Sequence, residues 1–308
     1  MLGFLVSRRW AAPRRRRPTW GVTARRSDLH ETWTQIQEAV AFLRGRCPLE
    51  PEVGLILGTG LGALADKIEA ECTLDYAEIP HFASSTVQSH HGRFVFGTLG
   101  GRRVVAMQGR VHYYEGYTMR QITLPVRVMR ALGAGTLVMS NAVGGMDPHL
   151  RPGDMTVITD HINLMGDNPL LGPNDERLGV RFPDMSEPYD RALVELAETT
   201  ALELGLPLHR AVYVAVAGPN LETAAEYRFL RAIGADTVGM SMVPECLVAV
   251  HGGMRVLGLS AVTDACFPDA LHPADVDGII RTAALIEPKL CRLVTELLRR
   301  LPPAGGAA

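Results

Sequence analysis

Short polar and glycine-rich clusters follow several apolar runs in this sequence, and the first of them could bind an anion. The segment GTGLG at 58–62 follows the apolar run 53–57. Backbone N–H groups in such a turn can face an anion, and the Thr59 hydroxyl adds a further donor. A tight turn between a strand and a helix would give the same pattern, so both interpretations stay open on this segment alone.

A dinucleotide-binding loop is another interpretation of 58–62. The G-x-G-x-x-G pattern requires its third glycine at position 63, where this chain has Ala63, and an acidic residue about 20 positions later, at the end of a second strand. Neither requirement is met. A nucleotide-binding module remains the non-enzyme alternative, and it predicts binding of a nicotinamide cofactor without phosphate-dependent turnover.

Cationic, aromatic and acidic groups are concentrated at 110–117, with the sequence RVHYYEGY. Arg110, at the end of a predicted strand, suits bidentate recognition of phosphate, and His90 in the segment SHHGR could supply another donor. Glu222 stands in AGPNLET at 217–223, at the start of a predicted helix. It either caps that helix or accepts a hydrogen bond from the N–H of a heterocycle.

These groups need a scaffold, and the pattern of apolar residues predicts alternating strands and helices. Such alternation is typical of an α/β fold, here a doubly wound, mostly parallel twisted sheet flanked by helices in a single domain. Ligands of such sheets bind outside the carboxyl ends of the strands, where the polar clusters are expected to converge. The segment 165–188, rich in Gly, Pro, Asn and Asp, is a long loop of the kind that tends to be functional. The predicted strands are 53–57, 94–99, 103–108, 136–140, 155–159, 210–216, 237–240 and 256–262, and the predicted helices are 30–43, 119–132, 189–204, 223–233, 244–251 and 273–300.

The charge and composition of the chain indicate which classes of binding partner are not expected. A formal net charge of -2 gives no reason to expect nucleic acid or an anionic membrane surface as a partner. No apolar run reaches the roughly 20 residues that span a bilayer. The five cysteines are scattered and form no CxxC pair, so we expect reduced thiols of a cytoplasmic protein, without a disulfide framework or a zinc site.

The two ends of the chain differ in composition from the rest. Residues 1–28 are rich in arginine, with a block of arginines at 14–17 between two prolines, which favours a disordered extension. An Arg-rich transit peptide, a twin-arginine signal through Arg8 and Arg9, and a misassigned start codon are the alternatives; no apolar segment follows the arginines, so secretion is not expected. Residues 302–308 are expected to form a flexible tail, which leaves 29–301 as the domain.

Several motifs, in order from about residue 50 to 265, resemble the trimeric purine nucleoside phosphorylase family. The resemblance implies reversible phosphorolysis of purine (deoxy)ribonucleosides to free base and (deoxy)ribose 1-phosphate. It also implies a homotrimer, with inorganic phosphate as co-substrate and no cofactor or metal. The motifs are GTGLG at 58–62, QGRVH at 108–112, NAVGG at 141–145, DHINL at 160–164, GPNDER at 172–177, AGPNLET at 217–223 and GMSMVPE at 239–245.

The resemblance also assigns residues to the three parts of a nucleoside and phosphate site. His112, Glu222 and Asp264 are the implied catalytic residues. Phe182 is expected to cover the ribose in a neighbouring subunit. The implied phosphate ligands are Thr59, His90, Arg110, Ala142 through its backbone, and Ser241; the implied ribose contacts are His112, Tyr114, Met240 and Phe182; the implied base contacts are Leu221, Glu222, Thr263 and Asp264.

Asp264 departs from the family pattern, because members specific for 6-oxopurines carry Asn at this position. An ionised Asp would accept from a 6-amino group, a protonated Asp would donate to N7, and a cap or turn role would involve no base contact. Glu222 suits the N1–H of a 6-oxopurine instead. We therefore expect 6-aminopurines to be accepted beside 6-oxopurines.

Two further departures concern apolar residues. Leu221 stands where many relatives carry Phe against the base. Val276 stands near the family's His that serves the 5′-hydroxyl of the ribose, and an apolar side chain there would suit a 5′-methylthio group. A methylthioadenosine phosphorylase is therefore the alternative enzyme.

Overall fold

The computed structural model describes residues 27–59, 61–84, 92–273 and 275–302, so the predictions for His90 and for residues 1–26 lie outside it. The sheet is built around β1 (Val53–Leu57), an apolar strand buried along its whole length. It pairs in parallel with β4 (Arg102–Gln108) and β5 (Thr136–Gly145). A continuous apolar run is typical of a strand covered on both faces.

One edge of the sheet is antiparallel. β3 (Arg93–Leu99) pairs with β4 across Gly100 and Gly101. Both glycines have positive φ, 58° and 77°, as a tight two-residue hairpin requires. The strands predicted at 94–99 and 103–108 are confirmed, and they form a β-hairpin. β2 (Glu69–Asp75), which the apolar pattern did not predict, pairs with β3 and forms the edge.

The other half of the sheet closes on itself. The strand order is β2-β3-β4-β1-β5-β8-β7-β6-β9, and β5 also pairs with β9, so β5, β8, β7, β6 and β9 form a ring. The α/β class is confirmed, and the sheet is mixed, because β5–β8 and β6–β9 are antiparallel in addition to the β2–β3–β4 edge. The strands named here for the first time are β6 (Met155–Leu164), β7 (His209–Val216), β8 (Thr237–Gly239) and β9 (Arg255–Ala265).

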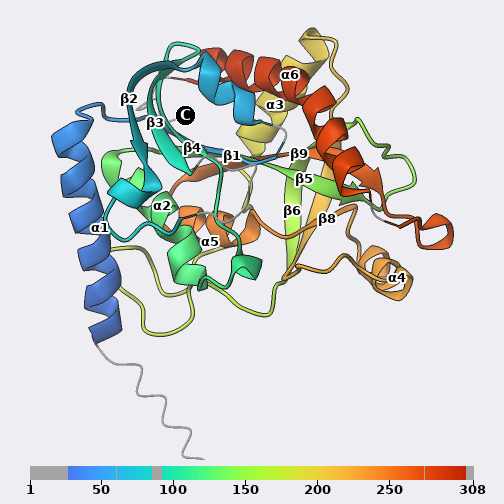
Figure 1. Ribbon diagram of the computed structural model, residues 1–308, viewed down its shortest axis with the longest axis horizontal. Helices are drawn as coiled ribbons and strands as arrows, with labels where there is room; N and C mark the ends of the chain where they lie inside the picture. The colour runs from blue at the N-terminus through green and yellow to red at the C-terminus, as the bar shows by residue number, and fades with distance from the viewer. Residues whose placement is uncertain (1–26, 60, 85–91, 274, 303–308) are drawn as a thin grey trace, which may run out of the picture.

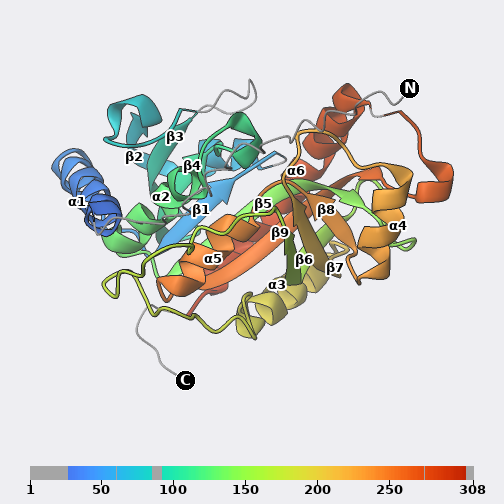
Figure 2. The same cartoon turned by 90° about the horizontal axis from the view of Figure 1, so that it is seen from below.

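Helices cover both faces of this sheet. In Figure 1, α1, α2 and α5 pack together on one side, α3 and α6 lie on the other, and α4 stands at the end farthest from α1. Figure 2 shows the same separation of α1 and α4 from below. The helices are α1 (Ser27–Arg46), α2 (Met119–Leu132), α3 (Arg191–Glu203), α4 (Ala224–Ala232), α5 (Val243–His251) and α6 (Val276–Arg300), with short 3₁₀ turns η1 (Gly62–Lys67), η2 (Tyr76–Glu78), η3 (Tyr113–Glu115) and η4 (Pro268–Ala270).

The start of α4 decides one of the alternatives for Glu222. Thr223 is the N-cap: its hydroxyl accepts from the backbone N–H of Glu226, and the Glu226 carboxylate accepts from the backbone N–H of Thr223 at 2.7 Å. This reciprocal pair is a complete capping box. The interpretation of Glu222 as the helix cap is therefore wrong, and its carboxylate is left for another role.

The prediction that all cysteines are reduced is wrong for one pair. Cys47, just after α1, is disulfide-bonded to Cys72 in the edge strand β2, with the Cα atoms 5.7 Å apart. Cys246, Cys266 and Cys291 are free and buried. In the part of the chain that the structure describes, no helix is long and apolar enough to cross a membrane.

Candidate active site

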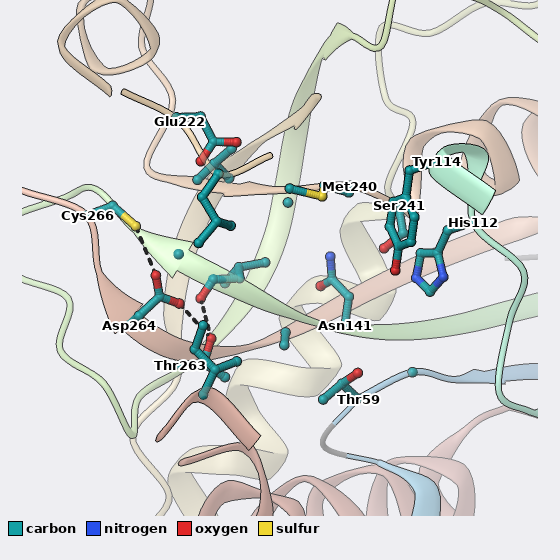
Figure 3. A pocket seen from close by; sticks show the side chains of 18 of the residues that line it. Thr59, His112, Tyr114, Asn141, Glu222, Met240, Ser241, Thr263, Asp264 and Cys266 are labelled. Carbon is teal, nitrogen blue, oxygen red and sulfur yellow. Dashed lines mark hydrogen bonds between the residues drawn. The ribbon is translucent and has the colours of Figure 1, made fainter. Parts of the chain in front are cut away.

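A pocket of about 260 Å³ opens where β1, β4, β5, β8 and β9 end or where the chain leaves them. Figure 3 shows His112, Tyr114 and Ser241 at one end, Glu222, Asp264 and Cys266 at the other, and Asn141 between them. The prediction that polar clusters converge at the carboxyl ends of the strands is thus confirmed. The cluster at 141–145 and Thr263–Asp264 lie within strands β5 and β9, which run further than predicted.

Gly58 begins the loop after β1 and lies unusually close to β5. A Cβ at this position would stand 2.4 Å from the Ser140 carbonyl oxygen, and the Gly58 N–H donates to Ser140 Oγ at 3.3 Å. Only glycine permits such an approach of two backbones. The close contact carries the next residue, Thr59, into the lining of the pocket.

Arg110 lines the same end of the pocket and is only 1% exposed. Its Nη1 donates to Glu245 Oε1 at 3.2 Å, and its Nη2 donates to the Ser140 carbonyl. Glu245, on α5, is also buried. The ion pair fixes a cation beside the pocket, where a buried guanidinium needs a partner charge.

His112 and Tyr114 are held by the turn η3. The Glu115 carboxylate accepts from the His112 backbone N–H at 2.6 Å and lies 3.3 Å from His112 Nδ1. The imidazole stacks on the Tyr114 ring with 4.8 Å between centroids. Burial raises the pKa of the Tyr114 phenol, and the Glu115 charge raises it further, so this hydroxyl keeps its hydrogen. Glu115 therefore orients His112, and the Tyr114 ring packs against the imidazole that Glu115 holds.

Ser241 and Met240 follow β8 and are positioned by buried neighbours. The Tyr213 hydroxyl donates to the Ser241 carbonyl at 2.9 Å and accepts from the Ser241 N–H at 3.2 Å. Met240 packs against Gly218, where a Cβ would stand 2.3 Å from the Met240 sulfur. Met242 follows with a φ of 70°, so the backbone turns sharply into α5.

The opposite end of the pocket holds two carboxylates. Burial raises the pKa of Glu222 above its ordinary value. Asp264 Oδ1 lies 2.8 Å from Thr263 Oγ1, and Asp264 Oδ2 lies 3.2 Å from Cys266 Sγ. Asp264 belongs to strand β9, so its interpretation as a helix cap or turn residue is wrong.

Among the described residues, the pocket contains every predicted site residue except Phe182. His90 lies outside the described residues, and Phe182 is 84% exposed and does not line the pocket of its own chain. Val276, expected near the ribose, is 61% exposed, and Ile279 one turn later lines the pocket instead. The predicted residues in the lining are Thr59, Arg110, His112, Tyr114, Ala142, Leu221, Glu222, Met240, Ser241, Thr263 and Asp264.

Sequence reasoning did not single out Asn141, Tyr227, Cys266 or Ile279 as site residues. Asn141 Oδ1 accepts from Ser260 Oγ at 2.6 Å, which directs its buried Nδ2 away from Ser260, and this nitrogen has no partner among the described residues. The position of Asn141 inside the NAVGG motif was a usable signal. Tyr227 and Ile279 lie on helices, where their apolar spacing is indistinguishable from that of core residues. Among the described residues, no cluster of three or more His, Cys, Asp or Glu side chains could hold a metal ion.

A mixed α/β sheet with a polar pocket at its strand ends defines a small-molecule site in an α/β protein. The chain belongs to the phosphorylase superfamily, whose family model matches residues 52–299. It is 50% identical over 264 residues to purine nucleoside phosphorylase 1 of Bacillus subtilis, covering 86% of this chain and 97% of that one.

Comparison with solved structures also finds purine nucleoside phosphorylases. A Schistosoma mansoni purine nucleoside phosphorylase in complex with adenosine has a TM-score of 0.83 and 39% identity, over 87% of this chain and 98% of that one. A complex of the Schistosoma mansoni enzyme with inosine has a TM-score of 0.83 and 38% identity, over 87% and 97%. The resemblance to purine nucleoside phosphorylases is therefore confirmed.

Proposed function

We propose that this chain catalyses the reversible phosphorolysis of purine (deoxy)ribonucleosides to free base and (deoxy)ribose 1-phosphate. One observation carries the proposal: groups suited to an anion and groups suited to a heterocycle occupy opposite ends of one pocket (Figure 3). A nucleoside placed along this pocket would have its anomeric carbon between the two ends. Family membership and the ligands of the related structures support the same reaction.

At the anion end, Thr59, Arg110 and Ser241 hold phosphate together with the backbone of Ala142. His112 and Tyr114 stand beside them and contact the ribose with Met240. A phosphate oxygen attacks the anomeric carbon as the bond to the purine N9 breaks, so the bonding electrons leave with the base. In the overall reaction the base takes up the proton of hydrogen phosphate and is released as the free purine. The protein's contribution is to position phosphate and to stabilise charge as it develops. Inorganic phosphate is the co-substrate, and the reaction as written needs no cofactor.

At the other end, the two carboxylates set the range of bases. The Glu222 carboxylate accepts from the N1–H of a 6-oxopurine. Asp264 accepts from the 6-amino group of a 6-aminopurine, because a carboxylate is an acceptor only. We therefore include 6-aminopurine nucleosides in the substrate range beside inosine and guanosine.

Two parts of the proposal concern the protein as a whole. Phe182, Val180 and Leu171 leave large apolar side chains exposed on the segment 165–188, by 84%, 64% and 62%. Large exposed apolar side chains on one segment suit a protein interface, which supports a homotrimer in which Phe182 reaches a neighbouring site. We also propose a cytoplasmic location; the three free, buried thiols agree with it, and the Cys47–Cys72 disulfide argues against it.

A methylthioadenosine phosphorylase is the alternative, and one observation favours it. The pocket residue supplied by α6 is Ile279, which is apolar. An apolar side chain suits a 5′-methylthio group better than a 5′-hydroxyl.

Measuring the free base released from nucleosides distinguishes the purine nucleoside phosphorylase, the methylthioadenosine phosphorylase and the binding module. Inosine, guanosine, adenosine and methylthioadenosine are each incubated with the enzyme, with and without inorganic phosphate. Phosphate-dependent release from inosine, guanosine or adenosine supports the proposal. Methylthioadenosine as clearly the best substrate supports the alternative. Release that does not depend on phosphate, or none from any nucleoside, contradicts the proposal; nicotinamide cofactor binding in that case would support a binding module.

A further inference from the structure

Cys266 is a buried thiol at the base end of the pocket, and its sulfur lies 3.2 Å from Asp264 Oδ2 (Figure 3). The room for this sulfur comes from Gly144 on the neighbouring strand β5. A Cβ on Gly144 would stand 2.4 Å from Cys266 Sγ and 3.4 Å from Asp264 Oδ2. Any side chain at position 144 would therefore displace the thiol.

The hydrogen-bond donors beside Asp264 determine which bonds its carboxylate accepts from the protein. Thr263 Oγ1 lies 2.8 Å from Oδ1 and 3.2 Å from the Val143 carbonyl oxygen, so its hydrogen has two possible acceptors, of which Asp264 is the nearer. The Cys266 Sγ lies 3.2 Å from Oδ2. Each of these groups has one hydrogen, and the carboxylate has none. When both hydrogens point at Asp264, each carboxylate oxygen accepts one bond from the protein and keeps lone pairs that face the pocket.

Burial keeps a hydrogen on the Cys266 thiol for Asp264. Burial raises the pKa of this thiol, and the Asp264 charge raises it further. The thiol therefore keeps its hydrogen and donates it to Asp264 Oδ2.

We propose that Cys266 is a specificity-determining positioning residue, which holds Asp264 as an acceptor for the exocyclic amino group of a 6-aminopurine. This inference rests on the proposed function and deepens it. Without the thiol, Oδ2 loses its donor and the carboxylate is free to turn about its Cβ–Cγ bond. Recognition of a 6-amino group then suffers, whereas recognition of a 6-oxopurine through Glu222 does not depend on this bond.

The test compares adenosine with inosine, which share the ribose and differ at the base edge. Cys266→Ala removes the donor, Cys266→Val removes it while filling the space, and Cys266→Ser keeps a donor. We expect the ratio of kcat/KM for adenosine to that for inosine to fall about fivefold to tenfold in the Ala and Val variants, as for the loss of a typical hydrogen bond. Ser should keep the ratio within about twofold of wild type. Cys291→Ala, which changes another buried free thiol outside the pocket, is the matched control.

A double-mutant cycle separates positioning from general damage. In an Asp264→Asn background the substitution Cys266→Ala should no longer change the ratio, because the bond it removes is already altered. An unchanged ratio in both the Ala and Val variants, a Ser variant that behaves like Ala, or an effect that persists in the Asp264→Asn background would each overturn the inference. So would a wild-type enzyme that turns over inosine and leaves adenosine intact.

Equilibrium binding keeps this test separate from the proposed function. Dissociation constants of adenine and hypoxanthine are measured by calorimetry in the presence of phosphate for the same variants. If wild type releases no base from either nucleoside, the proposed function fails, and a preference for adenine that falls in Cys266→Ala and Cys266→Val still supports the role of the thiol. Equal preference in wild type and both variants overturns it.

Discussion

Arg110 and Glu245 form an ion pair behind the anion end of the pocket, with 3.2 Å between Nη1 and Oε1 and side chains only 2% and 4% exposed. The pair links the segment that follows β4 to α5, and α5 begins directly after Ser241 and Met242. Because neither charge reaches solvent, each depends on the other. The same ion pair therefore contributes to the stability of the fold and to the placement of a cation beside the pocket.

Removing one partner of this ion pair should lower both the stability of the fold and the affinity for phosphate. Glu245→Ala leaves the guanidinium buried without its partner carboxylate, which we expect to lower the free energy of unfolding by about 3–5 kcal/mol. The KM for phosphate should rise in parallel, because Arg110 loses its fixed position. Urea unfolding and phosphate titration measure the two effects. Asp269→Asn, at an exposed ion pair with Arg228, is the control and should cost less than about 1 kcal/mol. Equal effects of the two substitutions would contradict the argument.

The raised pKa of Glu222 predicts a difference in pH dependence between substrates. As pH falls, this carboxylate gains its proton at a higher pH than an ordinary glutamate. A protonated Glu222 cannot accept from the N1–H of a 6-oxopurine through the protonated oxygen, but it can donate to N1 of adenine. The kcat/KM for inosine should therefore fall on the acid side before that for adenosine, and the ratio of adenosine to inosine should rise as pH falls.

Parallel pH profiles of the two nucleosides provide the measurement. Glu222→Gln, whose amide does not titrate, should remove the difference in acid limbs and lower the kcat/KM for inosine. Acid limbs that coincide in the wild-type enzyme would show that Glu222 does not discriminate through its proton.

Asp264→Asn should shift the substrate preference toward 6-oxopurines. An Asn amide can donate to N7 and to the 6-oxygen, both of which the carboxylate repels. We expect the kcat/KM ratio of inosine to adenosine to rise by about tenfold or more, since a site that lacks the right hydrogen-bonding group rejects a substrate strongly. Steady-state kinetics on both nucleosides measures the shift, and a ratio equal to that of wild type would exclude Asp264 from base selection.

Much of the fold could be predicted because its strands are apolar and its turns carry glycine. The strand at 53–57 and the helix at 119–132 were predicted with the bounds that the structure has. The edge strand β2, by contrast, has the sequence EAECTLD, and all its residues except Cys72 and Leu74 are exposed. An edge strand with so little buried surface leaves no apolar alternation to detect.

The candidate site was predictable only in part, because its residues meet through the topology of the sheet. Thr59 follows β1 and Asp264 lies in β9; both strands are neighbours of β5, and no spacing in the sequence shows this. The role of Cys266 depends on the space left by Gly144, more than a hundred residues earlier. The Cys47–Cys72 disulfide likewise joins a helix end to a strand that the sequence pattern did not reveal.

Phe182 tests whether the site is shared between subunits. Its side chain is 84% exposed and belongs to the loop 165–188, so it contributes to a pocket only if a neighbour accepts it. Phe182→Ala should raise the KM for inosine about tenfold through lost apolar contact, and leave the fold intact. Leu202→Ala, at an equally exposed apolar residue on α3, is the matched control and should leave the KM unchanged.

Mixed oligomers make the prediction specific. Phe182→Ala and Glu222→Ala subunits carrying different tags are coexpressed and purified through both tags. A pocket on a Phe182→Ala subunit still has Glu222 and receives Phe182 from its Glu222→Ala neighbour. Sites with the wild-type KM should therefore reappear in the mixture, although neither variant has them alone. A mixture showing only the raised KM of Phe182→Ala would place Phe182 outside the neighbouring site, and a monomer by light scattering would remove the basis of the shared pocket.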